Sequence, residues 1–193
     1  MNRLAGFLVV LVLAVSGNAA LAATECNTPP PNPPLSGTVV GGVVVNAGDF
    51  CVLAGANVSS GVQVNSGGIL ITCGSSISGG IVTNGAANLI IGAGADEEVP
   101  PVNFVCPGNV INGAVRISNT GSGAPILAPA PSISVERNAI TGGVHLIGNQ
   151  GMIVVANDMI NGGLFCSNNM FDLDDEGTPS IINGALHCKF TDE

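Results

Sequence analysis

The stretch Ile140-Thr141-Gly142-Gly143-Val144 decides the fold, because close copies of it recur along most of the chain. Each copy has an aliphatic residue, a residue that is usually polar, Gly or Ser, Gly or Ala, and a second aliphatic residue. The intervals between successive copies are 19, 19, 34, 29, 20 and 22 residues. The seven copies begin at Val39, Val58, Ile77, Ile111, Ile140, Ile160 and Ile182.

A repeat of this length, built from short β-branched runs and glycine corners, indicates one coil of a β-solenoid per copy. A single coil cannot bury its inner face, so neighbouring coils must stack. Glycine at the third or fourth position suits a bend that needs positive φ or a close approach of two backbones. Strand alternation predicts that Val144 and Leu146 point into the core and that His145 points outward.

A column of asparagines supports the same register. Asn46, Asn65 and Asn84 follow the motif at the same place in three successive coils, 19 residues apart. Amides stacked on strands about 4.8 Å apart can hydrogen-bond along the axis of the solenoid. We therefore expect these three residues to form a structural ladder.

With coils of variable length and this asparagine column, the chain resembles right-handed parallel β-helix proteins of the pectin-lyase-like type, from about Val39 to Lys189. The resemblance implies an all-β, right-handed parallel β-helix of about seven coils. It is architectural, because no catalytic motif of that class is matched. A left-handed β-helix is the alternative, since apolar residues also recur six positions apart at Val58, Val64 and Leu70. That class keeps a constant, shorter coil.

The N-terminus has the pattern of a secretory signal peptide. Arg3 gives a positive start, Leu4 to Val15 is apolar, and Ala20-Leu21-Ala22 fits the small-x-small cleavage pattern. The apolar run is shorter than a membrane span requires. We expect residues 1–22 to be removed, leaving a secreted protein with no transmembrane segment.

The rest of the chain divides into a spacer and a repeat domain. Residues 23–38 form a Pro-rich N-terminal spacer or cap, in which Thr28–Pro34 is expected to be a polyproline II segment. Residues 39–193 form the β-helix, with insertions near 93–108 and 120–131 where the intervals are longest. The second strand run is apolar on both sides, as in Leu89-Ile90-Ile91, so its outer side should be covered. We expect the insertions to cover it; a second chain or a binding partner is the alternative.

Six cysteines follow the signal peptide, and an even number in a secreted chain indicates three disulfides. Cys166 and Cys188 hold equivalent inward positions in the last two coils, which favours a bond between them. Proximity in the sequence then suggests the other two pairs. The expected pairs are Cys166 with Cys188, Cys26 with Cys51, and Cys73 with Cys106.

Composition limits the classes of function. Only 9% of the 193 residues are charged and the net charge is −9, so a nucleic-acid partner is disfavoured. The chain has neither Trp nor Tyr, the residues on which sugars usually stack. This disfavours a sugar site on the strand faces.

Two groups of residues are candidates for chemistry. Arg116, His145 and His187 share one outward column and are the candidate catalytic residues. That column, which is read from Val44 to His187, contains no acid that could act as their partner. Asp172, Asp174 and Glu176 begin like a calcium loop with acids at positions one, three and five and Gly177 at six. The twelfth position is Asn183 rather than glutamate, so these acids are also typical of an exposed acidic loop.

The function that these features favour is a structural one. We expect a secreted surface or matrix protein without catalytic activity or cofactor, acting in adhesion, spacing or self-association. A polysaccharide-acting lyase or hydrolase is the alternative by analogy of fold. A calcium-binding surface module is a further alternative, with calcium as its ion.

Overall fold

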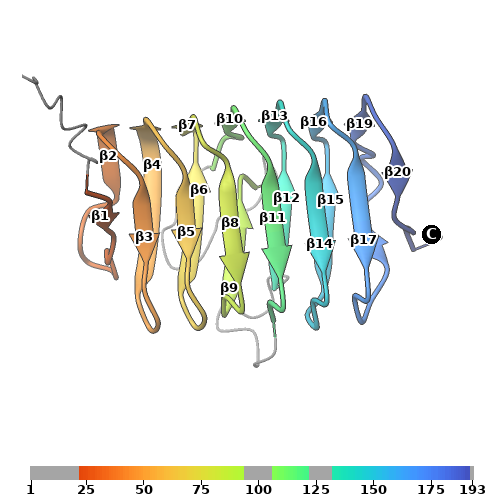
Figure 1. Ribbon diagram of the computed structural model, residues 1–193, viewed down its shortest axis with the longest axis horizontal. Helices are drawn as coiled ribbons and strands as arrows, with labels where there is room; N and C mark the ends of the chain where they lie inside the picture. The colour runs from red at the N-terminus through yellow and green to blue at the C-terminus, as the bar shows by residue number, and fades with distance from the viewer. Residues whose placement is uncertain (1–21, 94–105, 122–131, 192–193) are drawn as a thin grey trace, which may run out of the picture.

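The computed structural model describes residues 22–93, 106–121 and 132–191. The predicted signal peptide and most of both predicted insertions lie outside these residues. Within them every regular element is a β-strand, and all strand pairs are parallel. Figure 1 shows the strands side by side in a stack of coils that runs from the N-terminal to the C-terminal end. The expected all-β solenoid of about seven coils is confirmed.

The strands form three faces around a closed core. An eight-stranded sheet makes face 1. Its strands are β1 (Thr24–Glu25), β3 (Val43–Val45), β5 (Val62–Val64), β8 (Ile81–Asn84), β11 (Val115–Ser118), β14 (Val144–Ile147), β17 (Leu164–Ser167) and β20 (Leu186–His187).

A twelve-stranded sheet makes the other two faces, because the long strand β4 (Phe50–Val58) pairs with β6 through its first half and with β7 through its second. Face 2 continues from the first half of β4 through β6 (Ile69–Cys73), β9 (Asn88–Ile91), β12 (Ile133–Glu136), β15 (Ile153–Ala156) and β18 (Leu173–Asp174). Face 3 contains β2 (Leu35–Val39), the second half of β4, β7 (Ser76–Ile77), β10 (Val110–Ile111), β13 (Ala139–Ile140), β16 (Met159–Ile160) and β19 (Ile181–Ile182).

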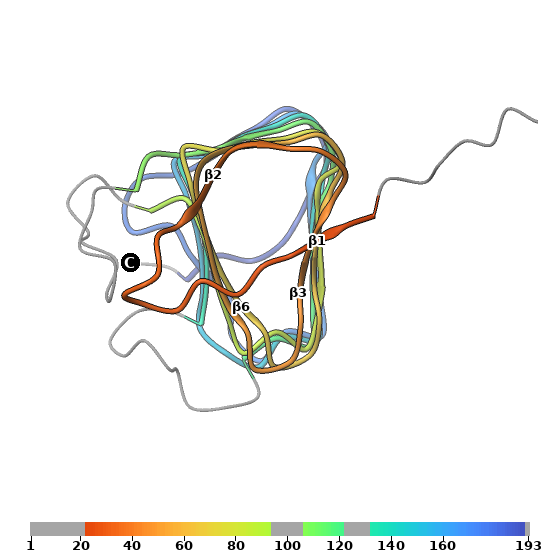
Figure 2. The same cartoon turned by 90° about the vertical axis from the view of Figure 1, so that its left-hand side faces the viewer.

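The coil is right-handed. Figure 2 looks along the axis from the N-terminal end, and the chain passes from β2 over the top to β3 on the right and back below to face 2. It therefore turns clockwise as it recedes from the viewer. The left-handed alternative is excluded, and the six-residue recurrence of apolar residues reflects the three faces of each coil.

Alternating side chains fill the core as expected. Val144 and Leu146 are fully buried on β14, whereas His145 between them is half-buried on the outside. The first motif position is buried in the first six copies, and the equivalent Ile182 of the last coil is partly buried against the same core. These aliphatic columns form one continuous cluster along the rod.

Face 2 is buried on both sides, which confirms the prediction that its outer side is covered. Every residue of β6, β9, β12 and β15 is buried. Val52, Ile71 and Ile90 form a second apolar cluster outside the sheet, together with Cys73 and Cys106. The N-terminal segment borders this side, because the Val52 N–H donates to Thr28 Oγ1 at 2.8 Å. That the two insertions cover the remainder stays a prediction.

The glycine corners are explained by the close approach of neighbouring coils. A Cβ on Gly142 would lie 2.6 Å from the carbonyl carbon of Gly113 in the preceding coil. A Cβ on Gly162 would lie 2.4 Å from the backbone nitrogen of Gly143. Only glycine allows such contacts between two backbones. The fourth motif position varies: a Cβ would have its nearest atoms 3.2 Å away at Gly143, but 2.3 Å away at Gly80, and the chain places Ala114 and Ala185 at this position in two other coils.

Residues 23–38 are part of the solenoid rather than a separate spacer, because they contain β1 and most of β2. The chain between them crosses the N-terminal end of the stack in Figure 2. The expected polyproline II segment is instead a turn, in which the Asn32 N–H donates to the Pro29 carbonyl at 2.9 Å. The turn is needed because the chain must reverse to enter β2.

Replacing Gly142 with alanine tests the corner contact. We expect Gly142→Ala to lower the free energy of unfolding by about 2–3 kcal/mol, because the new Cβ meets backbone atoms that cannot move independently. Gly143→Ala is the matched control at the neighbouring position, where the nearest atoms lie 3.2 Å away, and it should cost under about 1 kcal/mol. Denaturant unfolding measures both; equal losses would contradict this explanation.

Candidate functional site

The structure brings the three predicted catalytic candidates into one row on the outside of face 1. Arg116 is in register with His145, His145 with Phe165, and Phe165 with His187, so the four residues occupy successive coils. The His145 and Phe165 ring centroids are 5.0 Å apart, and those of Phe165 and His187 are 5.4 Å apart. The rings are nearly parallel, with interplanar angles of 15° and 20°. We call Arg116, His145, Phe165 and His187 the basic–aromatic row.

A hollow of about 340 Å³ lies beside the start of this row. Arg116 and His145 border it, together with polar groups such as Asn84 and Ser118. None of the described residues that line it is a carboxylate. The guanidinium and imidazole groups can therefore attract and hydrogen-bond an anionic group here, but a paired acid for acid–base cleavage is missing from this lining.

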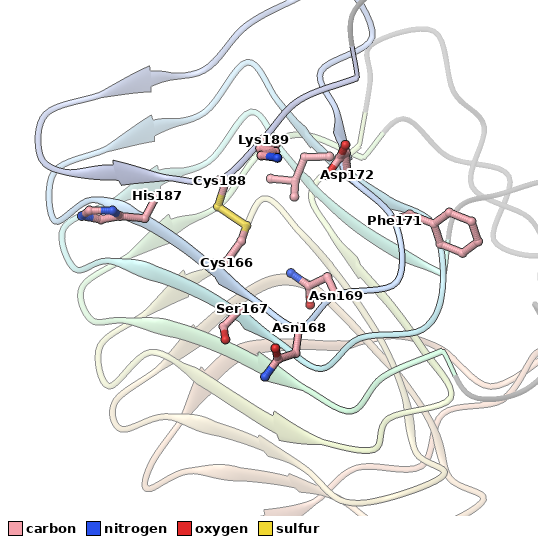
Figure 3. A pocket seen from close by; sticks show the side chains of 10 residues that line it. Cys166, Ser167, Asn168, Asn169, Phe171, Asp172, His187, Cys188 and Lys189 are labelled. Atoms are coloured by element: carbon pink, nitrogen blue, oxygen red, sulfur yellow. A yellow bond between two sulfur atoms is a disulfide. The ribbon is translucent and has the colours of Figure 1, made fainter.

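A second hollow, of about 520 Å³, lies at the C-terminal end of the rod and is shown in Figure 3. The Cys166–Cys188 disulfide, Asn169, Asp172 and Lys189 line it. Figure 3 shows His187 pointing to the outside of β20, while Cys188 turns to the opposite side. The hollow results from the end of the stack, because no further coil covers the last one within the described residues.

The three calcium candidates are spread over this end of the molecule. Asp172 lines the terminal hollow, whereas Asp174 lies in β18 and Glu176 in the turn that follows. Asp174 Oδ1 accepts the Glu176 N–H at 2.9 Å, so this carboxylate stabilises its own turn. Among the residues that the structure describes, no three His, Cys, Asp or Glu side chains are grouped as a metal site requires. Calcium binding at these acids stays a prediction.

The three disulfides have the expected pairing. They fix the first coil, the outside of face 2 and the last coil, and the Cα atoms of each pair are about 5 Å apart. Such bonds are consistent with an extracellular location. The pairs are Cys26–Cys51, Cys73–Cys106 and Cys166–Cys188.

The outer asparagine column forms hydrogen bonds between coils in two places. Asn65 Nδ2 donates to Asn46 Oδ1 at 3.2 Å. Asn84 Oδ1 accepts a hydrogen bond of 2.8 Å from Asn119 Nδ2 and a longer contact of 3.5 Å from the Ser118 hydroxyl. The column therefore connects coils, but its third member is bonded forward to the next coil.

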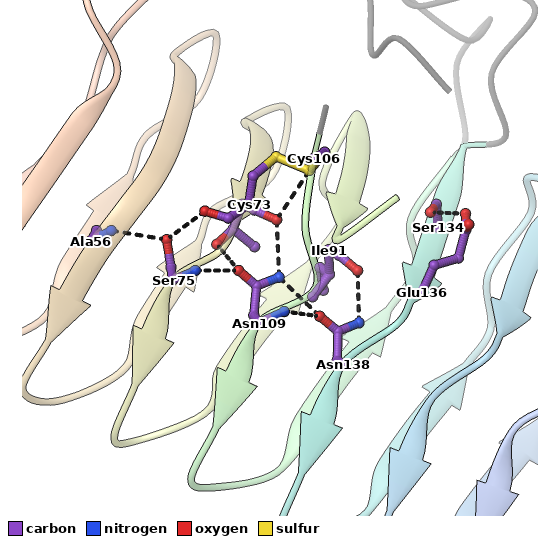
Figure 4. Close-up of a disulfide and its surroundings, with 10 residues drawn as sticks. Ala56, Cys73, Ser75, Ile91, Cys106, Asn109, Ser134, Glu136 and Asn138 are labelled. Carbon is purple, nitrogen blue, oxygen red and sulfur yellow. Dashed lines mark hydrogen bonds between the residues drawn. A yellow bond between two sulfur atoms is a disulfide. The ribbon is translucent and has the colours of Figure 1, made fainter. Parts of the chain in front are cut away.

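A second polar ladder, inside the molecule, was not predicted. Asn109 Nδ2 donates to Asn138 Oδ1 at 2.9 Å, and Asn138 Nδ2 donates to Asp158 Oδ1 at 3.0 Å (Figure 4 shows the first of these bonds). Ser75 precedes Asn109 in this column, and its N–H donates to Asn109 Oδ1. A regular signal existed, because each of these residues stands two positions before the first motif residue of its coil.

Asp158 is the one acid of this buried amide ladder. Its Oδ1 accepts the Asn138 N–H at 2.7 Å, and its buried Oδ2 has no partner among the described residues. The pKa of Asp158 is raised from 3.8 to about 8, chiefly because the carboxyl is buried and to a smaller extent because Glu136 is nearby, while the hydrogen bonds from Asn138 act in the opposite direction. The carboxyl is therefore protonated at neutral pH and takes the place of an amide.

Comparison with protein-family models, curated proteins and solved structures gives no match for this chain. The described part of the chain contains no helix with the length and apolarity needed to cross a membrane. Among the described residues, the surface features available for a function include the basic–aromatic row, the hollows on face 1 and at the C-terminal end, and the two ends of the rod.

Replacing Asp158 with asparagine tests its protonation. The raised pKa means that the folded state holds the proton more tightly than the unfolded state. Wild-type stability should therefore fall by up to about 1.4 kcal/mol per pH unit between about pH 4 and pH 8. In Asp158→Asn this dependence should disappear, because the new amide can donate to the Val135 carbonyl as Asn138 does to that of Ile91.

Thermal unfolding across this pH range, compared between the two proteins, measures the effect. Asp172→Asn is the matched control, because it makes the same change of side chain at an exposed position outside the buried ladder. A constant stability difference between wild type and Asp158→Asn at all pH values would contradict the assignment.

Proposed function

We propose that the protein is a secreted, non-catalytic component of a cell surface or matrix, and that its solenoid acts as a stiff rod for spacing and adhesion. The observation that carries this proposal is the continuous stack itself. Nearly all described strands belong to one parallel coil whose first and last turns are closed by Cys26–Cys51 and Cys166–Cys188. The architecture thus serves length and rigidity along one axis.

The packing of the rod supports a mechanical role. Backbone hydrogen bonds between coils run along the axis, as between the Val144 N–H and the Gly163 carbonyl at 2.9 Å. Bending the rod would separate these bonds on one side and compress glycine corners that already touch on another. The outer asparagine column and the buried amide ladder add further hydrogen bonds in the same direction.

Secretion is supported by two independent features. The N-terminal sequence has the three parts of a signal peptide. The cysteines of the chain form three disulfides and none is left free in the described residues, which suits an oxidising compartment. Adhesion and spacing require an exported protein, so these features agree with the proposed role.

The basic–aromatic row favours a second candidate, the binding of an anionic polysaccharide as a step in its cleavage or as adhesion alone. Arg116 and His145 border the 340 Å³ hollow and could hold a carboxylate or sulfate group. We favour adhesion over cleavage because cleavage needs a positioned acid as well. A glycan-acting enzyme and a calcium-binding module remain alternatives with testable consequences.

Localisation together with a glycan assay tests the proposal. We expect the protein at the surface of the cells that produce it, detectable by labelling of intact cells, and no release of new sugar ends from acidic or neutral polysaccharides. The variant Arg116→Gln/His145→Gln should keep the surface location. Lys189→Gln is the control, because it also removes a positive charge but lies outside the row.

Two outcomes would overturn the role as a rod. One is a protein found only inside the cell. The other is polysaccharide cleavage by the wild type that is abolished in Arg116→Gln/His145→Gln and retained in Lys189→Gln. The second outcome would assign the basic–aromatic row to catalysis.

A further inference from the structure

We propose that molecules of this protein stack head to tail through face 1, with β20 of one copy pairing in parallel with β1 of the next. The inference deepens the proposed function and rests on it, because it gives the rod a second copy of the same chain as its partner. The two ends of the eight-stranded sheet supply the surfaces. Hydrogen bonding, side-chain register and charge each point to the same arrangement.

Both ends of face 1 are open strands within the described residues. β1 and β20 are the first and last strands of the sheet, so each is paired on one side only. Leu186 on β20 is 51% exposed, whereas Val144 and Leu164, which precede it in the same inward column, are fully buried. An unpaired edge beside exposed core residues is a surface that another strand can extend.

The backbone at the two ends has matching donors and acceptors. In each coil the residue after the corner donates its N–H to the corner carbonyl of the next coil, as from Leu164 to Ala185 at 2.8 Å. Leu186 is the corresponding donor of the last coil. At the other end, Thr24 donates to Gly42 in the same way, which places Ala23 at the corner position of β1. The Leu186 N–H of one copy can thus donate to the Ala23 carbonyl of the next.

The corner position also tolerates the residue that this junction would bring there. Ala114 and Ala185 occupy the fourth motif position in their own coils, where the preceding coil has a glycine with positive φ, and the coil that follows Ala114 has Gly143 there. An alanine is therefore found on either side of this contact between two coils. Cleavage after Ala22, as the sequence predicts, would leave Ala23 as the first residue of the chain. The strand edge at β1 would then begin directly at the junction.

Charge distinguishes head-to-tail stacking from the other orientations. Glu25 is in register with Val44 at the start of the outward column, and His187 is the last member of the same column. Head-to-tail stacking places Glu25 of the next copy one strand spacing, about 4.8 Å, from His187. Tail-to-tail contact would instead bring two His187 side chains together, and head-to-head contact two Glu25 carboxylates.

The junction is confined to one part of the cross-section. β2 belongs to the same coil as β3, and the coil of β1 has no strand of its own on face 3. In stacked copies, an empty strand position would therefore separate β19 of one copy from β2 of the next. The paired strands are two residues long at each end. Such a contact is smaller than a stable dimer interface, so we expect reversible association that increases at high local concentration.

A charge-swap mixture tests the junction on the secreted full chain. Glu25→Lys alone would set a lysine against His187, and His187→Glu alone would set two carboxylates against each other. Each variant should therefore self-associate several-fold less than wild type. In an equimolar mixture, junctions between the introduced lysine and the introduced glutamate can alternate with junctions between native Glu25 and native His187. The mixture should regain wild-type association, which sedimentation velocity across a concentration series measures.

A carbodiimide then identifies the register, because it joins a lysine to a carboxylate only at contact distance. The mixture should yield a cross-linked peptide that contains positions 25 and 187. The matched control replaces Val82, three coils further along the same column and 48% exposed, and mixes Val82→Lys with His187→Glu. This control should give no cross-link between positions 82 and 187.

The outcomes separate this inference from the function of the rod. Restored association with the 25–187 peptide supports head-to-tail stacking. Absence of that peptide, or an equal yield of cross-link from the Val82→Lys control, overturns the stacking but leaves the surface rod in place. A protein that stacks as described but never reaches the cell surface overturns the proposed function instead.

Discussion

The structure depends on how closely one coil lies on the next at the glycine corners. At the third motif position the backbones of successive coils approach until a single methyl group would collide, as at Gly142 and Gly162. This contact lets all three faces keep parallel hydrogen bonding without a gap at the corner. The aliphatic columns, the amide ladders and the outward rows all follow from this common register.

The unusual composition follows from the same constraint. The fully buried columns inside the coil consist mainly of Val, Ile and Leu, and Phe190, near the C-terminal end, packs against them only partly buried. Buried polar groups must be bonded within the stack, and asparagine provides both a donor and an acceptor in that direction. Asp158 fits this pattern as a neutral carboxyl, because burial raises its pKa.

Features that recur with the motif could be predicted from the sequence. The spacing placed Arg116, His145 and His187 in one row and Cys166 beside Cys188, and the structure shows both arrangements. The buried ladder through Asn109 and Asn138 recurs with the same spacing but was missed, because its members stand before the motif rather than within it. These asparagines are buried because they lie where face 3 contacts face 2. The sequence of a single strand does not predict that contact.

Other features depend on contacts distant in the sequence. The sequence Thr24-Glu25 has no pattern that predicts a strand. These two residues form a strand only because they pair with β3. The Pro-rich segment has the composition of an extended spacer, yet its ends must meet face 2 and β2, so it turns. The grouping of the candidate calcium ligands likewise depends on how the last coil ends, which the local motif does not specify.

Amide hydrogen exchange at two leucines tests the stacked coil most directly. Leu164 donates its N–H to Ala185 in the following coil, whereas Leu186 holds the same position at the open end of face 1. In dilute solution we predict slow exchange at Leu164, near the rate of global unfolding, and exchange at Leu186 that is orders of magnitude faster. Equal exchange rates at the two leucines would contradict the claim that each coil is held by the next.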